Sequence, residues 1–189
     1  LFKYLGERML KIEVIDNLLD EYQSKAISEV LLGSKEVGAP DFPWLYTSNL
    51  NGTSRLGNYY FNTVFIGEGK HFPIVDAYLP FFMPILNALS IDISQVWRLK
   101  ANLFPRTQFI DHHASHIDHP QSDDMFTLLY YVNSNDGFTV IEGKNGWGRK
   151  KVKSVRNRLL IFDGGKPHHS TNCTNVNARC SLNFNCKRK

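Results

Sequence analysis

The stretch FTLLYYVNSNDGFTVI, residues 126–141, decides the fold class of this chain. It holds two apolar runs that are rich in aromatic and β-branched residues, and each is short enough to form one strand. The tripeptide Asn135-Asp136-Gly137 lies between the runs and is a typical hairpin turn. The stretch therefore predicts two strands joined by a tight turn.

Short runs of the same kind recur on both sides of this stretch, separated by turn residues. They cover residues 96–104, 108–110, 126–132, 138–141, 152–155, 158–162 and 179–184. Many short strands at regular spacing are typical of a β-sandwich or barrel. We therefore predict roughly seven or more strands after residue 94, arranged in two facing sheets.

The N-terminal half predicts elements that support this β core. We expect strands at residues 11–15 and 58–66, a helix at 16–33 with Asp16 as its N-cap, a loop at 34–56 and a second helix at 75–89. No linker or internal repeat divides the chain. We therefore expect a single domain over residues 1–189, with 1–94 as helical support and outer strands and 95–187 as the core, and the first helix packed outside one sheet.

Composition and charge exclude several classes of protein. The chain has 189 residues, of which 42% are hydrophobic and 21% charged, as in ordinary globular proteins. Its net charge of +4 is too small and too scattered to predict binding to nucleic acid. No apolar run reaches the ~18 residues of a membrane span. Three cysteines without paired spacing fit a reducing compartment, so we expect a cytoplasmic protein.

Histidine is distributed unevenly, in a way that indicates a site. Six of the seven histidines fall in two short stretches, residues 112–119 and 168–169. On a strand, His116 and Asp118 would point to the same side. Together with His168 or His169 they would make two histidines and one carboxylate on one metal, which is the facial triad of non-haem Fe(II) oxygenases. Buried structural polar groups and a zinc site are the alternatives.

Arg179 is the second candidate functional residue. It follows His168 by eleven residues, on an apolar strand where an unpaired charge would be costly. No aspartate or glutamate follows Asp163 in the chain to neutralise it. A ligand carboxylate gripped by the guanidinium would resolve that cost.

These motifs resemble those of the Fe(II)/2-oxoglutarate-dependent oxygenases, in particular the prolyl 4-hydroxylase-like branch. The matching segments are residues 116–120, 127–133, 157–162, 167–168 and 179–184. The resemblance implies a double-stranded β-helix, a jelly-roll relative. It also implies oxidative decarboxylation of 2-oxoglutarate coupled to hydroxylation, with Fe(II), 2-oxoglutarate and O₂ required and ascorbate as an auxiliary reductant.

The resemblance also assigns roles to individual residues. It makes His116, Asp118 and His168 the iron ligands, the last because Pro167-His168 matches the Pro-His pair of the family. It makes Arg179 and Tyr131 the residues that hold the 5-carboxylate of 2-oxoglutarate. Asn102 and Asn183 are expected to face the same pocket.

The expected substrate is a prolyl residue in a peptide or protein. Asn185 lies where the oxygen-sensing prolyl hydroxylases carry a bulky aromatic residue near the substrate, which leaves substrate identity open. Two alternatives remain for the function. One is the same chemistry on a small molecule such as a free amino acid, or on a nucleobase. The other is a catalytically silent domain that only binds a metal or ligand. The sequence leaves the oligomeric state open and does not place residues 34–56 and 67–75, the loops expected to shape selectivity.

Overall fold

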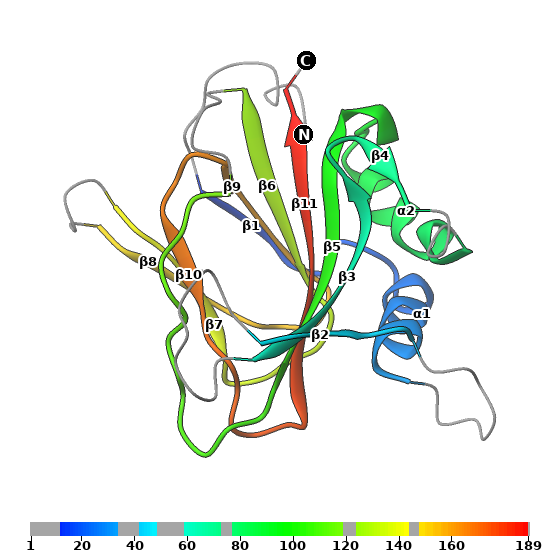
Figure 1. Cartoon of the computed structure of the whole chain (residues 1–189). Coiled ribbons are helices and arrows are strands. Elements are labelled where there is room, and N and C mark those ends of the chain that lie inside the picture. The colour runs from blue at the N-terminus through cyan, green and yellow to red at the C-terminus, as the bar shows by residue number, and fades with distance from the viewer. Residues whose placement is uncertain are drawn as a thin grey trace.

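The computed structural model describes residues 12–33, 42–48, 59–72, 77–118, 124–143 and 148–188 (Figure 1). The chain is mainly antiparallel β-sheet with two α-helices. The strands are β1 (Glu13–Ile15), β2 (Leu45–Thr47), β3 (Tyr60–Gly67), β4 (Lys70–His71), β5 (Val96–Pro105), β6 (Met125–Tyr131), β7 (Phe138–Ile141), β8 (Lys150–Lys153), β9 (Arg158–Asp163), β10 (His168–Ser170) and β11 (Ala178–Lys187). The helices are α1 (Glu21–Leu32), α2 (Leu79–Ala88) and the short 3₁₀ helix η2 (Ile93–Gln95).

The strands form a large and a small sheet. The large sheet has the order β1-β9-β6-β11-β5-β3-β2, with β4 added to β3, and the small sheet has the order β10-β7-β8. Figure 1 shows the small sheet lying opposite the central strands of the large one. Seven strands follow residue 94 in the described part of the chain, so the predicted two-sheet core is confirmed.

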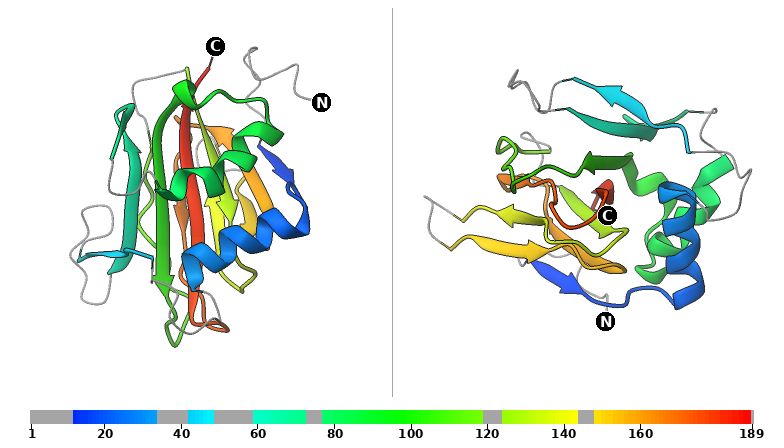
Figure 2. Two further views of the ribbon diagram at one scale, coloured as in Figure 1. Left: turned by 90° about the vertical axis from the view of Figure 1, so that its right-hand side faces the viewer. Right: turned by 90° about the horizontal axis from the view of Figure 1, so that it is seen from below.

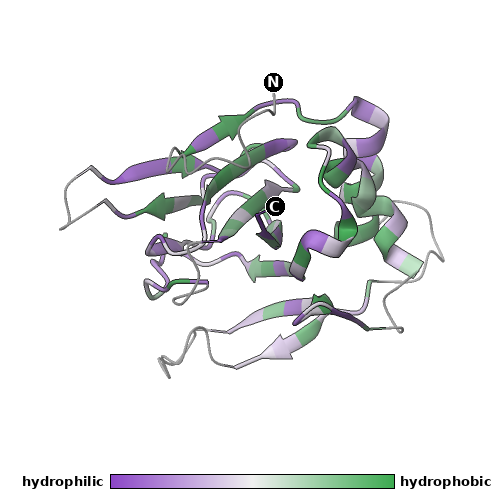
Figure 3. Ribbon diagram, turned by 90° about the horizontal axis from the view of Figure 1, so that it is seen from above, coloured by the Kyte–Doolittle hydropathy of each residue, from purple (hydrophilic) through white to green (hydrophobic). Residues whose placement is uncertain are grey.

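Alternation along β11 explains how the core and the site are separated. Cys180, Leu182 and Phe184 face outward into the main hydrophobic cluster with the helices. Arg179, Ser181 and Asn183 alternate with them and face a cavity between the sheets. The adjacent strand β5 alternates in the same way, with Leu99 and Ala101 in the cluster and Lys100 and Asn102 lining the cavity. Figure 3 shows hydrophobic residues on the strands and on the helices that pack against them. The large sheet therefore buries one apolar face under the helices, and its inner face carries the polar residues of the cavity beside a second apolar cluster that includes Leu129, Leu160 and Phe162.

The two helices cover the outer face of the large sheet, as Figure 2 shows. In α1, Ile27 and Leu31 are buried one turn apart and join the same cluster as the outward residues of β11. α2 contributes Phe82, Ile85 and Leu86. The expected packing of the first helix outside one sheet is confirmed. Within the described residues, no helix is both long and apolar enough to cross a membrane.

The first helix begins later than predicted. Asp20, not Asp16, is the N-cap, and its side chain accepts a hydrogen bond from the Gln23 amide at 2.8 Å. Asp16 instead receives two hydrogen bonds from Arg158, at 2.6 and 2.9 Å. Asn17 has a φ of 52°, so the chain turns there before the helix starts.

Two strand predictions also need correction. Residues 108–110 are not a strand, because Phe109 is 73% exposed and its carbonyl accepts a local hydrogen bond from the Thr107 hydroxyl. The turn at residues 135–137 does not close a hairpin. The strands on its two sides, β6 and β7, lie in different sheets, so this segment crosses between the sheets.

Most of the expected loop at residues 34–56 and part of that at 67–75 lie outside the described residues. The described parts contain β2 and β4. The expected strand at 58–66 corresponds to β3, and the expected helix at 75–89 corresponds to α2.

Candidate active site

The cavity between the two sheets has a volume of about 390 Å³. Strands β5, β6, β9 and β11 of the large sheet and β7 and β10 of the small sheet all contribute to it. The residues that line it are Tyr60, Arg98, Lys100, Asn102, Phe104, His116, Ile117, Asp118, Thr127, Leu129, Thr139, Phe162, His168, Ser170, Arg179, Ser181 and Asn183.

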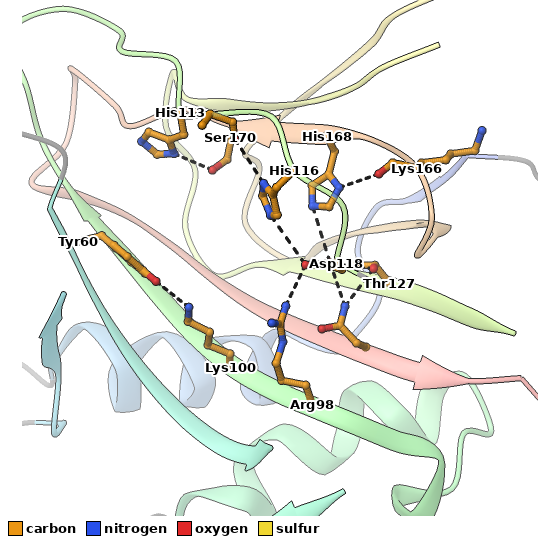
Figure 4. Close-up of polar contacts among 12 residues, drawn as sticks. Tyr60, Arg98, Lys100, His113, His116, Asp118, Thr127, Lys166, His168 and Ser170 are labelled. Atoms are coloured by element: carbon orange, nitrogen blue, oxygen red, sulfur yellow. Dashed lines mark hydrogen bonds and ion pairs between the residues drawn. The ribbon is translucent and has the colours of Figure 1, made fainter. Parts of the chain in front are cut away.

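The predicted metal ligands converge at one end of this cavity (Figure 4). Ligand atoms of His116, Asp118 and His168 all lie within 4.8 Å of one another. The Nε2 atoms of His116 and His168 are 3.8 and 3.7 Å from the Asp118 carboxylate oxygens. His116 forms an isolated antiparallel bridge with His168, through two backbone hydrogen bonds of 2.9 Å. Asp118 lies in a bend, so the pair is not on the regular strand that we predicted.

Backbone carbonyls fix the orientation of both imidazoles. The Nδ1 of His168 contacts the Lys166 carbonyl at 3.0 Å, and that of His116 contacts the Ala114 carbonyl at 3.4 Å. Because a carbonyl can only accept, Nδ1 carries a proton in both rings, and Nε2 is the nitrogen that faces Asp118. Burial and the neighbouring His168 lower the pKa of His116 to about 4, so its ring is neutral near pH 7.

Three side chains that the sequence reasoning missed hold the Asp118 carboxylate. Arg98 donates to it at 2.9 Å, Asn185 at 2.9 Å and Thr127 at 3.0 Å. Burial alone would raise the pKa of Asp118, but His168 and Arg98 outweigh burial and lower the pKa to about 2. The carboxylate is therefore ionised and held in one position.

The register of the large sheet explains why these three residues meet. Arg98 pairs with Asn185 across β5 and β11, and Asn185 pairs with Thr127 across β11 and β6. All three point to the inner face and form one row across the sheet. In the sequence, Asn185 stands out only as a departure from the aromatic residue of the prolyl hydroxylases. Asn185 lies an even number of residues from Arg179 on the same strand, so the two side chains share a face. This spacing is the signal in the sequence that could have placed Asn185 in the site.

The structure distinguishes the two adjacent histidines. His168 is buried and points toward Asp118. His169 points away, with Nδ1 3.4 Å from Glu142 and Nε2 3.0 Å from the Nδ1 of His112. The two rings face opposite ways because they are neighbours on β10. The geometry therefore favours His168 over His169 as the third member of the triad.

Arg179 lies at the other end of the cavity and is only 1% exposed. Its Nε donates to the Ser154 hydroxyl at 2.8 Å and its Nη2 to the Thr139 hydroxyl at 3.0 Å. In the described part of the chain, no carboxylate lies within ion-pair distance of it. Burial lowers the pKa of Arg179 below its ordinary value. A buried guanidinium with neutral partners is suited to binding an anionic ligand.

Tyr131 is close to Arg179 but does not line the cavity. Its hydroxyl donates to Thr139 at 2.9 Å, and its ring lies 5.6 Å from the guanidinium carbon. Thr139 thus accepts hydrogen bonds from both Tyr131 and Arg179, which leaves its own hydroxyl proton free to be donated into the cavity. Tyr131 would therefore act on a carboxylate through Thr139, a residue that sequence reasoning missed, rather than by direct contact.

The two predicted asparagines lie between these ends. Asn102 and Asn183 both line the cavity, as expected from their alternation with Arg98 and Arg179. The Oδ1 of Asn183 is buried and accepts no hydrogen bond from the part of the chain that the structure describes. A polar ligand atom would satisfy it.

The other histidines near the site lie outside the triad. The His113 ring packs on Phe104 at 4.6 Å, and its Nδ1 contacts the Ser170 hydroxyl at 2.9 Å. Burial and the nearby Arg179 lower the pKa of His113 to about 3. His112 contacts His169, and His119 lies outside the described residues.

The donor set of the triad fits a transition metal. Two imidazole nitrogens and one ionised carboxylate lie close enough together to hold one ion, and all three residues line the cavity. Two histidines and one carboxylate with open positions are the ligand set of non-haem Fe(II) oxygenases. Catalytic zinc can use the same set, but zinc hydrolysis gives no role to the buried guanidinium of Arg179.

Comparison with known proteins identifies the fold. No sequence-family model matches the chain, and neither does any curated protein. A 2OG-Fe(II) oxygenase family oxidoreductase from Burkholderia pseudomallei is similar in structure, with a TM-score of 0.65 and 13% identity over 96% of this chain and 88% of that chain. A prolyl hydroxylase from Trichoplax adhaerens, in complex with a peptide of hypoxia inducible factor, gives a TM-score of 0.62 and 15% identity over 95% of this chain and 84% of that chain.

A prolyl-4-hydroxylase from Pseudomonas putida is also similar, with a TM-score of 0.52 and 16% identity over 94% of this chain and 92% of that chain. These likenesses extend over nearly the whole chain, so they are not limited to the segments that carry the sequence resemblance. The fold is the double-stranded β-helix of the 2-oxoglutarate oxygenases, as predicted. At such low identity the likeness defines the fold, and function must be argued from the site.

Proposed function

We propose that this chain is an Fe(II)- and 2-oxoglutarate-dependent dioxygenase that hydroxylates a C–H bond, with a prolyl residue of a peptide or protein as the preferred substrate. One observation carries the proposal. The His116, Asp118 and His168 triad and the buried Arg179 open onto the same cavity of about 390 Å³. A metal site and an anion site in one cavity suit a cosubstrate that binds at both ends.

The proposed roles follow from the contacts. His116, Asp118 and His168 would hold Fe(II), and Arg98, Asn185 and Thr127 keep the carboxylate in position. Arg179 would bind the distal carboxylate of 2-oxoglutarate, assisted by the Thr139 hydroxyl and indirectly by Tyr131. Asn102 and Asn183 would contact ligands between the two ends.

The cofactor and the chain would divide the chemistry between them. Bound iron, with 2-oxoglutarate and O₂, would supply the oxidising power for hydroxylation, with ascorbate to restore the reduced metal. The side chains supply position, charge and exclusion of water. Phe162 packs on His168 with the ring centroids 4.7 Å apart, the Phe104 ring lies 5.6 Å from the Arg179 guanidinium carbon, and Leu129 also lines the cavity, so both ends have apolar walls. Those walls strengthen the interaction of Arg179 with a carboxylate by lowering the local dielectric constant.

The substrate assignment rests on similarity to prolyl hydroxylases in fold and in motif order. The proposal also treats residues 1–189 as one domain, because β1 and β3 of the N-terminal half pair with β9 and β5 of the C-terminal half. A cytoplasmic location is supported by three buried cysteines that form no disulfide.

The test is turnover of 2-oxoglutarate to succinate in the presence of Fe(II), O₂ and ascorbate, without and with proline-containing peptides. Mass spectrometry should show the addition of one oxygen atom to a prolyl residue. Peptides in which alanine replaces proline are the control. Absence of succinate formation in a folded, iron-loaded protein would refute the dioxygenase proposal. Turnover without prolyl oxidation would refute only the substrate class.

Two adjacent histidines offer a matched pair for the metal site. His168→Ala should lose Fe(II) binding and turnover, because it removes one of three ligands. His169→Ala should keep both, because its ring points toward Glu142 and His112. Metal content of the purified proteins measures the difference. A reversed result would show that His169 is the ligand.

A further inference from the structure

Lys100 is a cationic residue in the cavity that the proposed reaction does not use. It lies on β5 between Arg98 and Asn102, and its side chain is partly buried. The ammonium donates to the Tyr60 hydroxyl at 2.8 Å. No carboxylate of the described residues lies within ion-pair distance of it. Two of its three donor hydrogens therefore have no protein acceptor in that part of the chain.

The protein holds this ammonium with a neutral and rigid partner. Tyr60 is 7% exposed, and its ring stacks on Phe104 with the centroids 5.5 Å apart and an interplanar angle of 18°. Burial and the neighbouring Arg98 lower the pKa of Lys100 to about 8. The amine is still mostly protonated near pH 7. An anion bound beside it would recover part of the desolvation cost.

The charges in the cavity are unbalanced. Three cations, Arg98, Lys100 and Arg179, and one carboxylate, Asp118, line it. Fe(II) would add two positive charges and 2-oxoglutarate two negative ones, so a surplus of two positive charges would remain in the loaded site. Arg98 is occupied by Asp118, and Arg179 is assigned to 2-oxoglutarate. Lys100 is therefore the cavity cation for which the described residues offer no anionic partner.

The position of Lys100 indicates what that partner is. In the register of the sheet Lys100 pairs with Asn183, one row away from the Arg98–Asn185 row that contacts Asp118. Two residues along a strand cover about 6.7 Å. A group at Lys100 is thus within a small molecule's length of the metal end. The unsatisfied Oδ1 of Asn183 in the same row also indicates a polar ligand there.

We propose that Lys100, held by Tyr60, binds a carboxylate of the substrate itself, so that the hydroxylated compound is an acid. This inference rests on the proposed dioxygenase function and narrows its substrate class. It favours a free or C-terminal amino acid, or a prolyl residue beside an acidic one, over a neutral internal prolyl peptide.

The probes are N-acetyl-L-proline and N-acetyl-L-prolinamide, which have nearly the same shape and differ by one charge. Binding is measured by calorimetry on protein loaded with Mn(II) and 2-oxoglutarate, so no turnover is needed. The wild type should bind the acid about tenfold to a hundredfold more tightly than the amide, as expected for charge-assisted hydrogen bonds. Equal binding of both compounds, or binding of neither, would overturn the inference.

Variants of Lys100 test whether this residue provides the preference. Lys100→Met should bind the acid and the amide equally while keeping its affinity for 2-oxoglutarate, and Lys100→Arg should restore the preference for the acid. Lys70→Met, on the exposed strand β4, is the control for removal of a lysine and should behave as the wild type. Weaker 2-oxoglutarate binding by Lys100→Met would overturn the inference, because the ammonium would then hold the cosubstrate.

The source of the carboxylate is tested with N-acetyl-Asp-Pro-amide. Tight binding of this dipeptide places the acid on a neighbouring residue of a peptide. Preference for N-acetyl-L-proline places it on the amino acid itself. Either result supports an acidic substrate. A protein that prefers acids but releases no CO₂ from 2-oxoglutarate with Fe(II) would refute the dioxygenase function and leave the anion site standing.

Discussion

At one end of the cavity Asp118 accepts hydrogen bonds from a guanidinium, an amide and a hydroxyl, whereas at the other end Arg179 donates only to two hydroxyls. The carboxylate has a charged partner within the protein, and the guanidinium has none among the described residues. Hydrogen bonds from within the chain would hold the Asp118 carboxylate in place before a metal binds. The neutral partners of Arg179 would leave its charge for a ligand from outside.

The largest effect is expected at the metal end. Asp118→Asn keeps the shape of the side chain but removes the charge that pairs with Arg98 and that would bind the metal. Metal affinity should fall by more than the roughly 10–100-fold typical of losing a supporting residue. Turnover should be lost with it. Isothermal titration with Mn(II) measures the change, and retained metal affinity would show that Asp118 is a structural ion-pair partner instead.

Much of the Arg179 end could be predicted from the sequence, because it relies on alternation along a strand. Arg179 and Asn183 were placed by counting residues along β11. The partners across the sheet could not be placed in this way. Arg98, Asn185 and Thr127 meet only through the register of three strands that are far apart in the chain. That register depends on tertiary packing.

The strand that carries His168 was missed for a different reason. Residues 168–170 read His-His-Ser and show no apolar alternation. They form β10 because the backbone pairs with β7 on one side and with His116 on the other. The predicted hairpin at residues 135–137 failed for a related reason. Local turn chemistry marks a reversal of the chain but does not say which sheet receives the next strand.

At the other end, Arg179→Met should weaken 2-oxoglutarate binding by about tenfold to a hundredfold. A hydrogen bond to a charged group contributes ~1.5–3 kcal/mol, at ~1.4 kcal/mol per decade. Metal affinity should not change, because the triad is untouched. Arg106→Met removes an exposed arginine and serves as the control. An unchanged affinity for 2-oxoglutarate in a folded Arg179→Met protein would place the distal carboxylate elsewhere.

A smaller effect is expected at Thr139, which links Tyr131 to Arg179. Thr139→Val keeps the volume and removes the hydroxyl that accepts from both residues. The loss of one neutral hydrogen bond to the ligand, ~0.5–1.5 kcal/mol, should weaken 2-oxoglutarate binding by about two- to tenfold. Tyr131→Phe, which removes only the outer link, should have less effect. A larger loss in Tyr131→Phe than in Thr139→Val would mean that Tyr131 contacts the carboxylate directly.

The smallest effect near neutral pH concerns His113, which packs beside Phe104 close to Arg179. Its pKa is lowered from 6.5 to about 3 by burial and by Arg179. Between these values the unfolded chain binds the proton and the folded protein does not, so the free energy of unfolding falls as the pH falls. The stability contributed by the neutral ring is present above about pH 6.5 and declines toward pH 3, by up to ~1.4 kcal/mol per pH unit.

Urea unfolding of the metal-free protein between about pH 7 and pH 4 measures this slope. His113→Gln, which can still bond to Ser170, should show a shallower slope than the wild type. Parallel curves for the two proteins would mean that His113 already titrates near its ordinary pKa, and that Arg179 and the buried site do not keep its ring neutral.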